Sequence, residues 1–329
     1  MSGVGSTLAP ARADRHARAG TASDPTRLPE HEWRALERAH AERADALTAA
    51  HRERKSRGER HPIEDFLFTY YTTTPGQLRR WHPGAGVALA GAGEERASWR
   101  HYRPEPAGDA VADAAVDLEE YFAKRSGTVD YVESLLERTL DRPPRFGCFG
   151  LHEWAMVYRM SPEHLRHRGL ELRVGHEATD AVVDAHPIVC THFDAYRFFT
   201  DAALPLNELT PTRESQRDLE QSGCLHAGMD VYKWAAKLGP IVPGAVLLDA
   251  FVLASEIREV DMRASPYEVS GFGLAAIPIE TPEGKREYAD LQRGFAARGD
   301  ALRRQVLAAI SVARAERPAE AEACAGRSD

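Results

Sequence analysis

Apolar residues recur every three or four positions over most of the chain, which is the spacing that places them on one face of an α-helix. The first such stretch carries its apolar set among many charged residues: Trp33, Leu36, His40 and Leu47. The pattern predicts helices over six segments: 30–58, 128–140, 151–159, 223–238, 243–263 and 283–313. Thr281, followed by Pro282, fits the cap that begins the last of them.

Few segments carry a pattern typical of β-strands. Residues 86–103 predict a small hairpin or edge strands, 170–190 a strand pair, and 275–280 one short strand. The sum predicts a mainly α fold, a single multi-helix globular domain with a few short peripheral β-strands. This domain covers residues 29–315, between a disordered leader at 1–28 and a disordered tail at 316–329, both rich in small and polar residues.

Composition narrows the functional classes. The chain has 329 residues and a net charge of −8, so its overall charge gives no reason to expect nucleic acid. A local basic run at 52–60, RERKSRGER, is either a binding footprint or a solvated helix end.

Four widely spaced cysteines without a CxxC pair argue against a zinc ribbon and favour reduced thiols. No long apolar run and no signal-peptide core is present, so we expect a cytoplasmic protein without membrane contact.

The segment 224–234, CLHAGMDVYKW, holds the first candidate chemistry. His226 and Asp230 are four residues apart in a predicted helix and share one face. Such a pair is a metal half-site, a proton-transfer pair or a buried polar contact. With His152 and His192 in other elements, and with Asp230 or Glu256, His226 can complete a site for Fe, Mn or Zn. The alternative is that these histidines have their hydrogen bonds satisfied in the core.

Two further segments place charge among apolar side chains. In 192–199, HFDAYRFF, Asp194 and Arg197 stand among aromatic residues that can stack a planar ligand, or else form a salt-bridged core helix. In the helix 243–263, Asp249 and Glu256 are seven residues apart on an apolar face. Each must pair with arginine, bind a ligand or reach solvent, because burying an unpaired carboxylate costs several kcal/mol. Arg213, in a Pro-bounded loop, can bind a phosphate or cap a helix.

Several long strings identify a resemblance: HPIEDFLFTYY, QLRRWHPG, FGCFGLHEWAMVY, THFDAYRFF, PLNELTPTRESQ, CLHAGMDVYKWAAKLGP and REVDMRASPY. Over about residues 30–310 the chain resembles an actinobacterial family whose members commonly carry the name 3-methyladenine DNA glycosylase. The resemblance implies DNA repair, in which a hydrolase draws a damaged purine of alkylated DNA into an aromatic pocket and breaks its N-glycosidic bond.

Residue roles follow from that resemblance. A carboxylate would stabilise the developing oxocarbenium charge, with Asp194 first and Asp230 or Glu256 as competitors. His226 joins them as a catalytic candidate. The residues that would stack the base are Trp154, Tyr196, Phe198 and Trp234. Arg197 and Arg213 would hold phosphates.

Two other functions stay open from the residues alone. One is a helical metal-dependent oxygenase or hydrolase that acts on a small molecule, with its metal on His152, His192 and His226. The other is a noncatalytic binding module, in which these polar groups only hold the core together.

Overall fold

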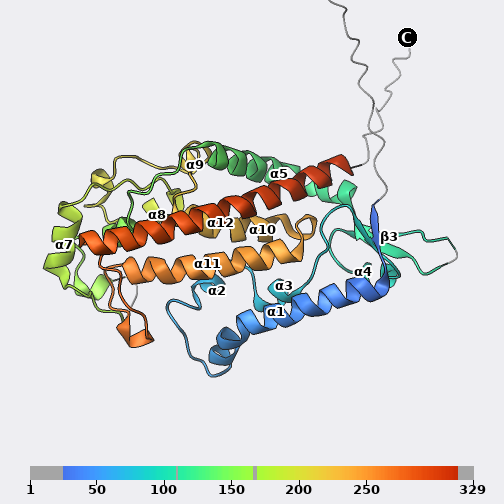
Figure 1. The fold of residues 1–329 in the computed structure, drawn as a ribbon, viewed down its shortest axis with the longest axis horizontal. Coiled ribbons are helices and arrows are strands. Elements are labelled where there is room, and N and C mark those ends of the chain that lie inside the picture. The colour runs from blue at the N-terminus through green and yellow to red at the C-terminus, as the bar shows by residue number, and fades with distance from the viewer. Residues whose placement is uncertain (1–24, 109, 166–168, 318–329) are drawn as a thin grey trace, which may run out of the picture.

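The computed structural model describes residues 25–108, 110–165 and 169–317, and five long helices dominate them. These are α1 (Glu30–Ser56), α5 (Leu118–Asp141), α10 (Leu225–Leu238), α11 (Gly244–Ala264) and α12 (Pro282–Ala315). In Figure 1, α12 runs along the long axis with α5 on one side and α11 on the other, and α1 follows the far side of α11. The mainly α fold is confirmed.

α10 occupies the centre of this arrangement and packs against both α11 and α12. Ten of its 14 residues are buried, and Asp230 is among them. At Gly228 a Cβ atom would lie 2.8 Å from the Ile257 Cδ1 atom of α11. A glycine there lets the two helices approach closely, which brings α10 and α11 side chains to one site.

A small sheet lies at one end of the molecule (Figure 1). Its four strands are β1 (Thr26–Leu28), β2 (Val87–Leu89), β3 (Tyr102–Glu105) and β4 (Asp113–Val116), in the order β1-β2-β4-β3. β1 and β2 are parallel and the other pairs antiparallel, with Leu89 opposite Ala114 and Tyr102 opposite Val116. The prediction of peripheral strands within 86–103 is therefore confirmed, although the short helix α4 (Gly93–Arg96) interrupts them.

Short helices connect these elements and carry most of the remaining site residues. They are α2 (Phe66–Tyr70), α3 (Pro75–Arg79), α6 (Leu151–Ala155), α7 (His176–Asp184), α8 (Phe193–Tyr196) and α9 (Gln216–Leu219). Four 3₁₀ turns complete the described chain: Pro162–His164, Leu204–Leu206, Gly239–Ile241 and Ser270–Phe272.

Two strand predictions were wrong. Within 170–190 the chain forms α7, in which the buried Thr179 and Val183 lie one helical turn apart. Residues 275–280 form no strand. Ile277 and Ile279 alternate toward the core as predicted, but the Ile277 backbone N–H donates to the Arg263 carbonyl of α11 at 2.7 Å. The alternating pattern correctly indicated buried isoleucines, but this segment pairs with a helix end and not with a neighbouring strand.

Helix boundaries follow local capping. α5 begins ten residues before its predicted start, because the Asp117 carboxylate accepts from the Glu120 N–H at 3.0 Å. Thr281 caps α12 as predicted, accepting from the Gly284 N–H at 3.1 Å. Most of the predicted leader and tail lies outside the described residues, while 26–28 form β1. In the described ranges, every helix is too short or too polar to cross a membrane.

Candidate functional site

A cavity of about 190 Å³ opens between α2, α6, α8, α10 and α11. We call it the aromatic pocket. Its walls include four aromatic side chains, Phe66, Tyr70, Tyr71 and Phe198. Its polar lining consists of Glu153, His192, Asp194, His226, Asp230 and Arg258. An apolar cavity with a few convergent polar groups is the usual form of a small-ligand site.

One side of the site is a buried histidine–carboxylate pair. The His152 Nε2 atom lies 2.8 Å from the Asp261 Oδ1 atom, and its Nδ1 atom lies 3.4 Å from the Cys148 sulfur. Burial lowers the pKa of His152, but the Asp261 carboxylate outweighs burial and holds that pKa well above its usual value. His152 is therefore a cation at neutral pH. Arg258 supports the pair, with its Nη1 atom 3.4 Å from Asp261 and 3.0 Å from Glu153.

The opposite side repeats this arrangement. The His192 Nδ1 atom makes an ion-pair contact of 3.0 Å with Glu220 Oε1, and both side chains are almost fully buried. Burial lowers the pKa of His192, and the Glu220 carboxylate more than reverses that effect, so the pKa is raised. Gln216 of α9 donates a hydrogen bond to Glu220, and Tyr131 donates to Gln216 at 2.8 Å. This second pair is thus held by polar contacts from α5 and α9.

His226 lies between the two pairs. Its ring centroid is 4.4 Å from that of His152 and 5.4 Å from that of His192, against which it stacks. Its Nδ1 atom is buried without a hydrogen-bond partner. Burial first, and then the charge of His152, hold the pKa of His226 well below its usual value. We call these three histidines with Asp261 and Glu220 the histidine centre: the pKa of the middle imidazole is lowered, and the pKa values of the outer two are raised.

Two carboxylates and a lysine complete the polar lining. The Lys233 ammonium lies 2.7 Å from Asp230 Oδ2 and 3.1 Å from Asp194 Oδ2. The Tyr71 hydroxyl donates to Asp230 at 3.0 Å. Burial raises the pKa of Asp194, but Lys233 outweighs it, so this pKa is lowered and the group is ionised at neutral pH. Arg197 also approaches Asp194, at 3.1 Å, and lies over the Phe198 ring.

The same residues offer ligands for a metal ion. The ligand atoms of His152, Glu153, His226 and Asp261 lie within 4.8 Å of one another, and those of His192, Glu220 and Asp230 form a second such group. Imidazole and carboxylate together suit Fe, Mn or Zn. Arg258 already neutralises Glu153 and Asp261, and Lys233 neutralises Asp230. A metal would therefore have to compete with cations that are present in the protein itself.

Most of the residues singled out in the sequence meet here. His152, His192 and His226 come from three separate segments, and the ring of His226 contacts those of both His152 and His192. Asp194, Asp230 and Phe198 line the same pocket.

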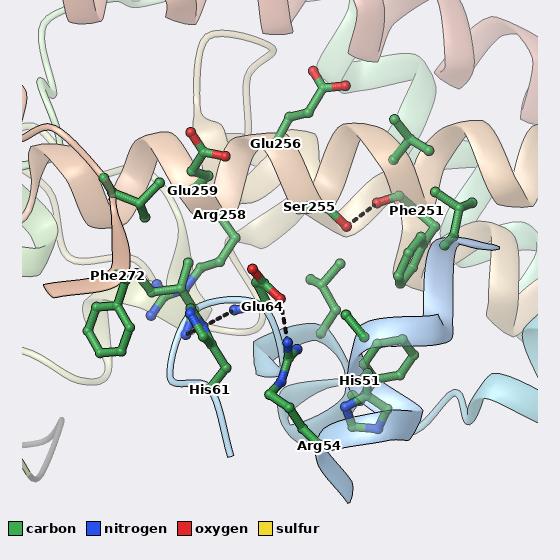
Figure 2. A pocket seen from close by; sticks show the side chains of 17 residues that line it. His51, Arg54, His61, Glu64, Phe251, Ser255, Glu256, Arg258, Glu259 and Phe272 are labelled. Atoms are coloured by element: carbon green, nitrogen blue, oxygen red, sulfur yellow. Dashed lines mark hydrogen bonds and ion pairs between the residues drawn. The ribbon is translucent and has the colours of Figure 1, made fainter. Parts of the chain in front are cut away.

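Glu256 does not reach this site. Its side chain is 45% exposed and pairs with Arg298 of α12. Figure 2 shows it extending from the opposite side of α11 to Arg258. Asp249 is equally exposed, 2.6 Å from Arg43 of α1. Of the alternatives open from the sequence, both carboxylates follow pairing with arginine, with side chains that also reach water, and neither enters the aromatic pocket.

The remaining predicted residues lie around the site without lining it. Trp154 is fully buried and donates its indole N–H to the Ala264 carbonyl at 2.9 Å, so it is a core residue. Trp234 packs beside Tyr131, with Lys233 over its ring. Tyr196 is buried with its hydroxyl 3.4 Å from the Leu204 carbonyl. These three rings are not placed to stack a ligand in the aromatic pocket.

Arg213 reaches the outer edge of the site. Its side chain is 66% exposed and lies 3.8 Å from Asp194, with its guanidinium over the Phe193 ring.

Several residues of the site were not predicted as site residues from the sequence. Arg258 and Asp261 are three apart in REVD of the helix 243–263, and Lys233 is three after Asp230, so helical spacing could have found them. Glu153 follows His152 directly. Glu220 carried no signal, because it follows a four-residue helix and only the fold brings it to His192.

A second cavity of about 310 Å³ lies on the other side of Arg258, between α1, α2 and α11 (Figure 2). Its charged groups are paired locally, with Arg54 2.6 Å from Asp65 and 2.7 Å from Glu64. Although this cavity is larger, its histidines and glutamates form no cluster of ligand atoms within the described residues, so we place the candidate site in the aromatic pocket.

No family model, no curated protein and no solved structure matches this chain.

Proposed function

We propose that this protein is a hydrolase that breaks the N-glycosidic bond of an alkylated purine held in the aromatic pocket. The observation that carries the proposal is the meeting of aromatic walls with an ionised carboxylate, Asp194, and a neutral imidazole, His226, around one cavity of about 190 Å³. The resemblance of the sequence to the family named 3-methyladenine DNA glycosylase favours alkylated DNA as the carrier of that base.

The walls suit the substrate. An alkylated purine is planar and cationic, so stacking on Tyr70, Tyr71 or Phe198 would add cation–π attraction of about 1–2 kcal/mol when the base is desolvated. A base inside a duplex must be extruded before it can reach such a cavity.

The polar lining suits bond cleavage. The electrons of the glycosidic bond leave with the cationic base, which becomes neutral and needs no proton. Positive charge then develops on the sugar, and the Asp194 carboxylate, with Asp230 beside it, stabilises that charge. A water molecule bonds to the sugar carbon through its oxygen and gives one proton to the His226 imidazole. Burial, with the charges of His152 and His192, keeps His226 unprotonated and so able to accept that proton, while making it a weak base.

The test is release of free 3-methyladenine from methylated DNA, measured by chromatography. The wild-type protein should release the base. Asp194→Asn should lower the rate at least about 100-fold, which is typical for losing one electrostatic group that acts in the transition state. Glu256→Gln is the matched control, because that carboxylate is exposed and outside the pocket, and its rate should equal wild type. Folded wild-type protein that releases no base, or an Asp194→Asn variant as fast as wild type, would contradict the proposal.

A second candidate function rests on the metal-ligand group. We propose, as the alternative, a helical metal-dependent hydrolase or oxygenase whose Fe, Mn or Zn is held by His152, His226 and Asp261, with Glu153 as a fourth ligand. It ranks second because Arg258 already pairs with two of those ligands. Elemental analysis of untagged protein decides it: about one metal per chain, lost in His152→Gln, is expected, and less than a tenth of an equivalent in several preparations excludes it.

A further inference from the structure

A third cavity, of about 250 Å³, lies at the C-terminal end of α10, against the Gly239–Ile241 turn and α5. We call it the basic pocket. Its charged lining is entirely cationic and consists of Arg80, Arg100, Arg125 and Lys237, together with His82 and His101. No aspartate or glutamate among the described residues lines it.

These cations differ from most arginines of the protein. Elsewhere an arginine usually has a carboxylate beside it, as Arg298 has Glu256 and Arg314 has Asp130. Over the ranges that the structure describes, no ion pair joins Arg80, Arg100, Arg125 or Lys237 to a carboxylate. Like charges gathered without counterions raise the energy of the folded state, so this arrangement favours binding of an anion.

Two of the arginines are held in place. The Arg125 guanidinium donates to the Lys237 carbonyl at the end of α10, while its Nε atom is buried with no hydrogen-bond partner. Arg80 lies over the Trp99 ring, 4.8 Å from its centroid. A buried guanidinium N–H without a partner is costly, so Arg125 has a donor that the protein itself leaves unsatisfied.

The histidines add donors or acceptors more than charge. Burial, and then the charge of Arg80, lower the pKa of His82 to about 3, so it is neutral at physiological pH. Its Nδ1 atom lies 3.0 Å from the Tyr102 hydroxyl. His101 contacts Glu120, which also pairs with Lys124. The cationic groups of the cavity that have no carboxylate beside them are therefore its arginines and lysine.

We propose that the basic pocket binds a phosphate group. Phosphate suits it because planar guanidinium forks match phosphate oxygens, and because its charge of up to −2 balances more than one cation. The pocket is separate from the histidine centre. Asp230 and Leu238 are eight residues apart on α10, which is about 12 Å along a helix. The ligand is either a free phosphate compound or a phosphodiester of DNA, and these share the recognising chemistry.

The test compares two variants with the same loss of charge. Arg80→Gln/Arg100→Gln removes two unpaired cations of the basic pocket, and Arg286→Gln/Arg293→Gln removes two exposed arginines of α12 that have carboxylates beside them. Calorimetry measures pyrophosphate binding, and fluorescence anisotropy measures binding of a short labelled DNA duplex, both at one fixed salt concentration. Neither readout requires base release, so failure here is distinct from failure of the proposed hydrolysis.

The wild-type protein should bind pyrophosphate, DNA or both. The Arg80→Gln/Arg100→Gln variant should bind at least tenfold more weakly, and the α12 variant should stay within twofold of wild type. Loss of pyrophosphate binding alone identifies a free phosphate compound as the ligand, whereas loss of DNA binding identifies the phosphodiester. The proposal is overturned if wild type binds neither probe, or if both variants weaken binding equally.

Discussion

The histidine centre and the basic pocket lie along the same helix, α10, and treat charge in opposite ways. In the histidine centre almost every charge is buried against one of opposite sign, such as His152 with Asp261 and His192 with Glu220. In the basic pocket the cations are partly solvated and lack carboxylates. Buried charges paired with opposite charges hold each other's positions and protonation states. A cluster of cations without carboxylates is instead stabilised when an anion binds from outside. The comparison separates the site for which we propose chemistry from the one for which we propose anion binding.

The largest expected effect comes from unbalancing the histidine centre. Asp261→Asn removes the carboxylate that His152 and Arg258 share, so the buried His152 must either lose its proton or stay charged without that partner. We expect it to lower the free energy of unfolding by about 3–5 kcal/mol, the range for breaking a buried pair. Urea denaturation at pH 7 measures the change.

Glu256→Gln is the control on the same helix. It removes one exposed ion pair, and such pairs contribute about 0–1 kcal/mol. Equal losses in the two variants would contradict the account of a buried, balanced centre.

An intermediate and pH-dependent effect is expected for His192→Gln. The folded-state pKa of His192 is raised, so its stabilisation is fully present below the unfolded value of about 6.5 and is lost as the pH rises through the folded value. The gap in unfolding free energy between wild type and variant should therefore shrink as the pH rises above about 6.5. Denaturation at pH 6, 7.5 and 9 measures that gap. If it stayed constant or widened, the charged state of His192 would be refuted.

The smallest effect is expected in the basic pocket. Arg100 is exposed and pairs with no carboxylate in the described ranges, so Arg100→Gln should change the free energy of unfolding by less than about 0.5 kcal/mol, and relief of repulsion favours a gain. Thermal unfolding without added phosphate measures it. A loss above about 1 kcal/mol would assign this arginine a structural role and remove the contrast between the two regions.

Helical periodicity predicted the long helices well, because each buries one face against neighbours that do not alter its local hydrogen bonds. It also placed His226 and Asp230 on α10. It could not tell which side of α11 reaches the site. Asp261 enters the histidine centre and Glu256 reaches α12, although both stand in the same helix. Helix α7 and the segment 275–280 show the same limit. A short apolar pattern shows that residues are buried, but it does not show which element they pack against.

Nuclear magnetic resonance of the histidine side chains tests the central claim, that one neutral imidazole is held between two charged ones. Protein labelled with ¹⁵N in histidine reports the protonation of each ring nitrogen, and His152→Gln, His192→Gln and His226→Gln variants assign the three signals. At pH 7 we predict imidazolium signals for His152 and His192 and a neutral imidazole for His226. A charged His226, or three neutral rings, would contradict the account.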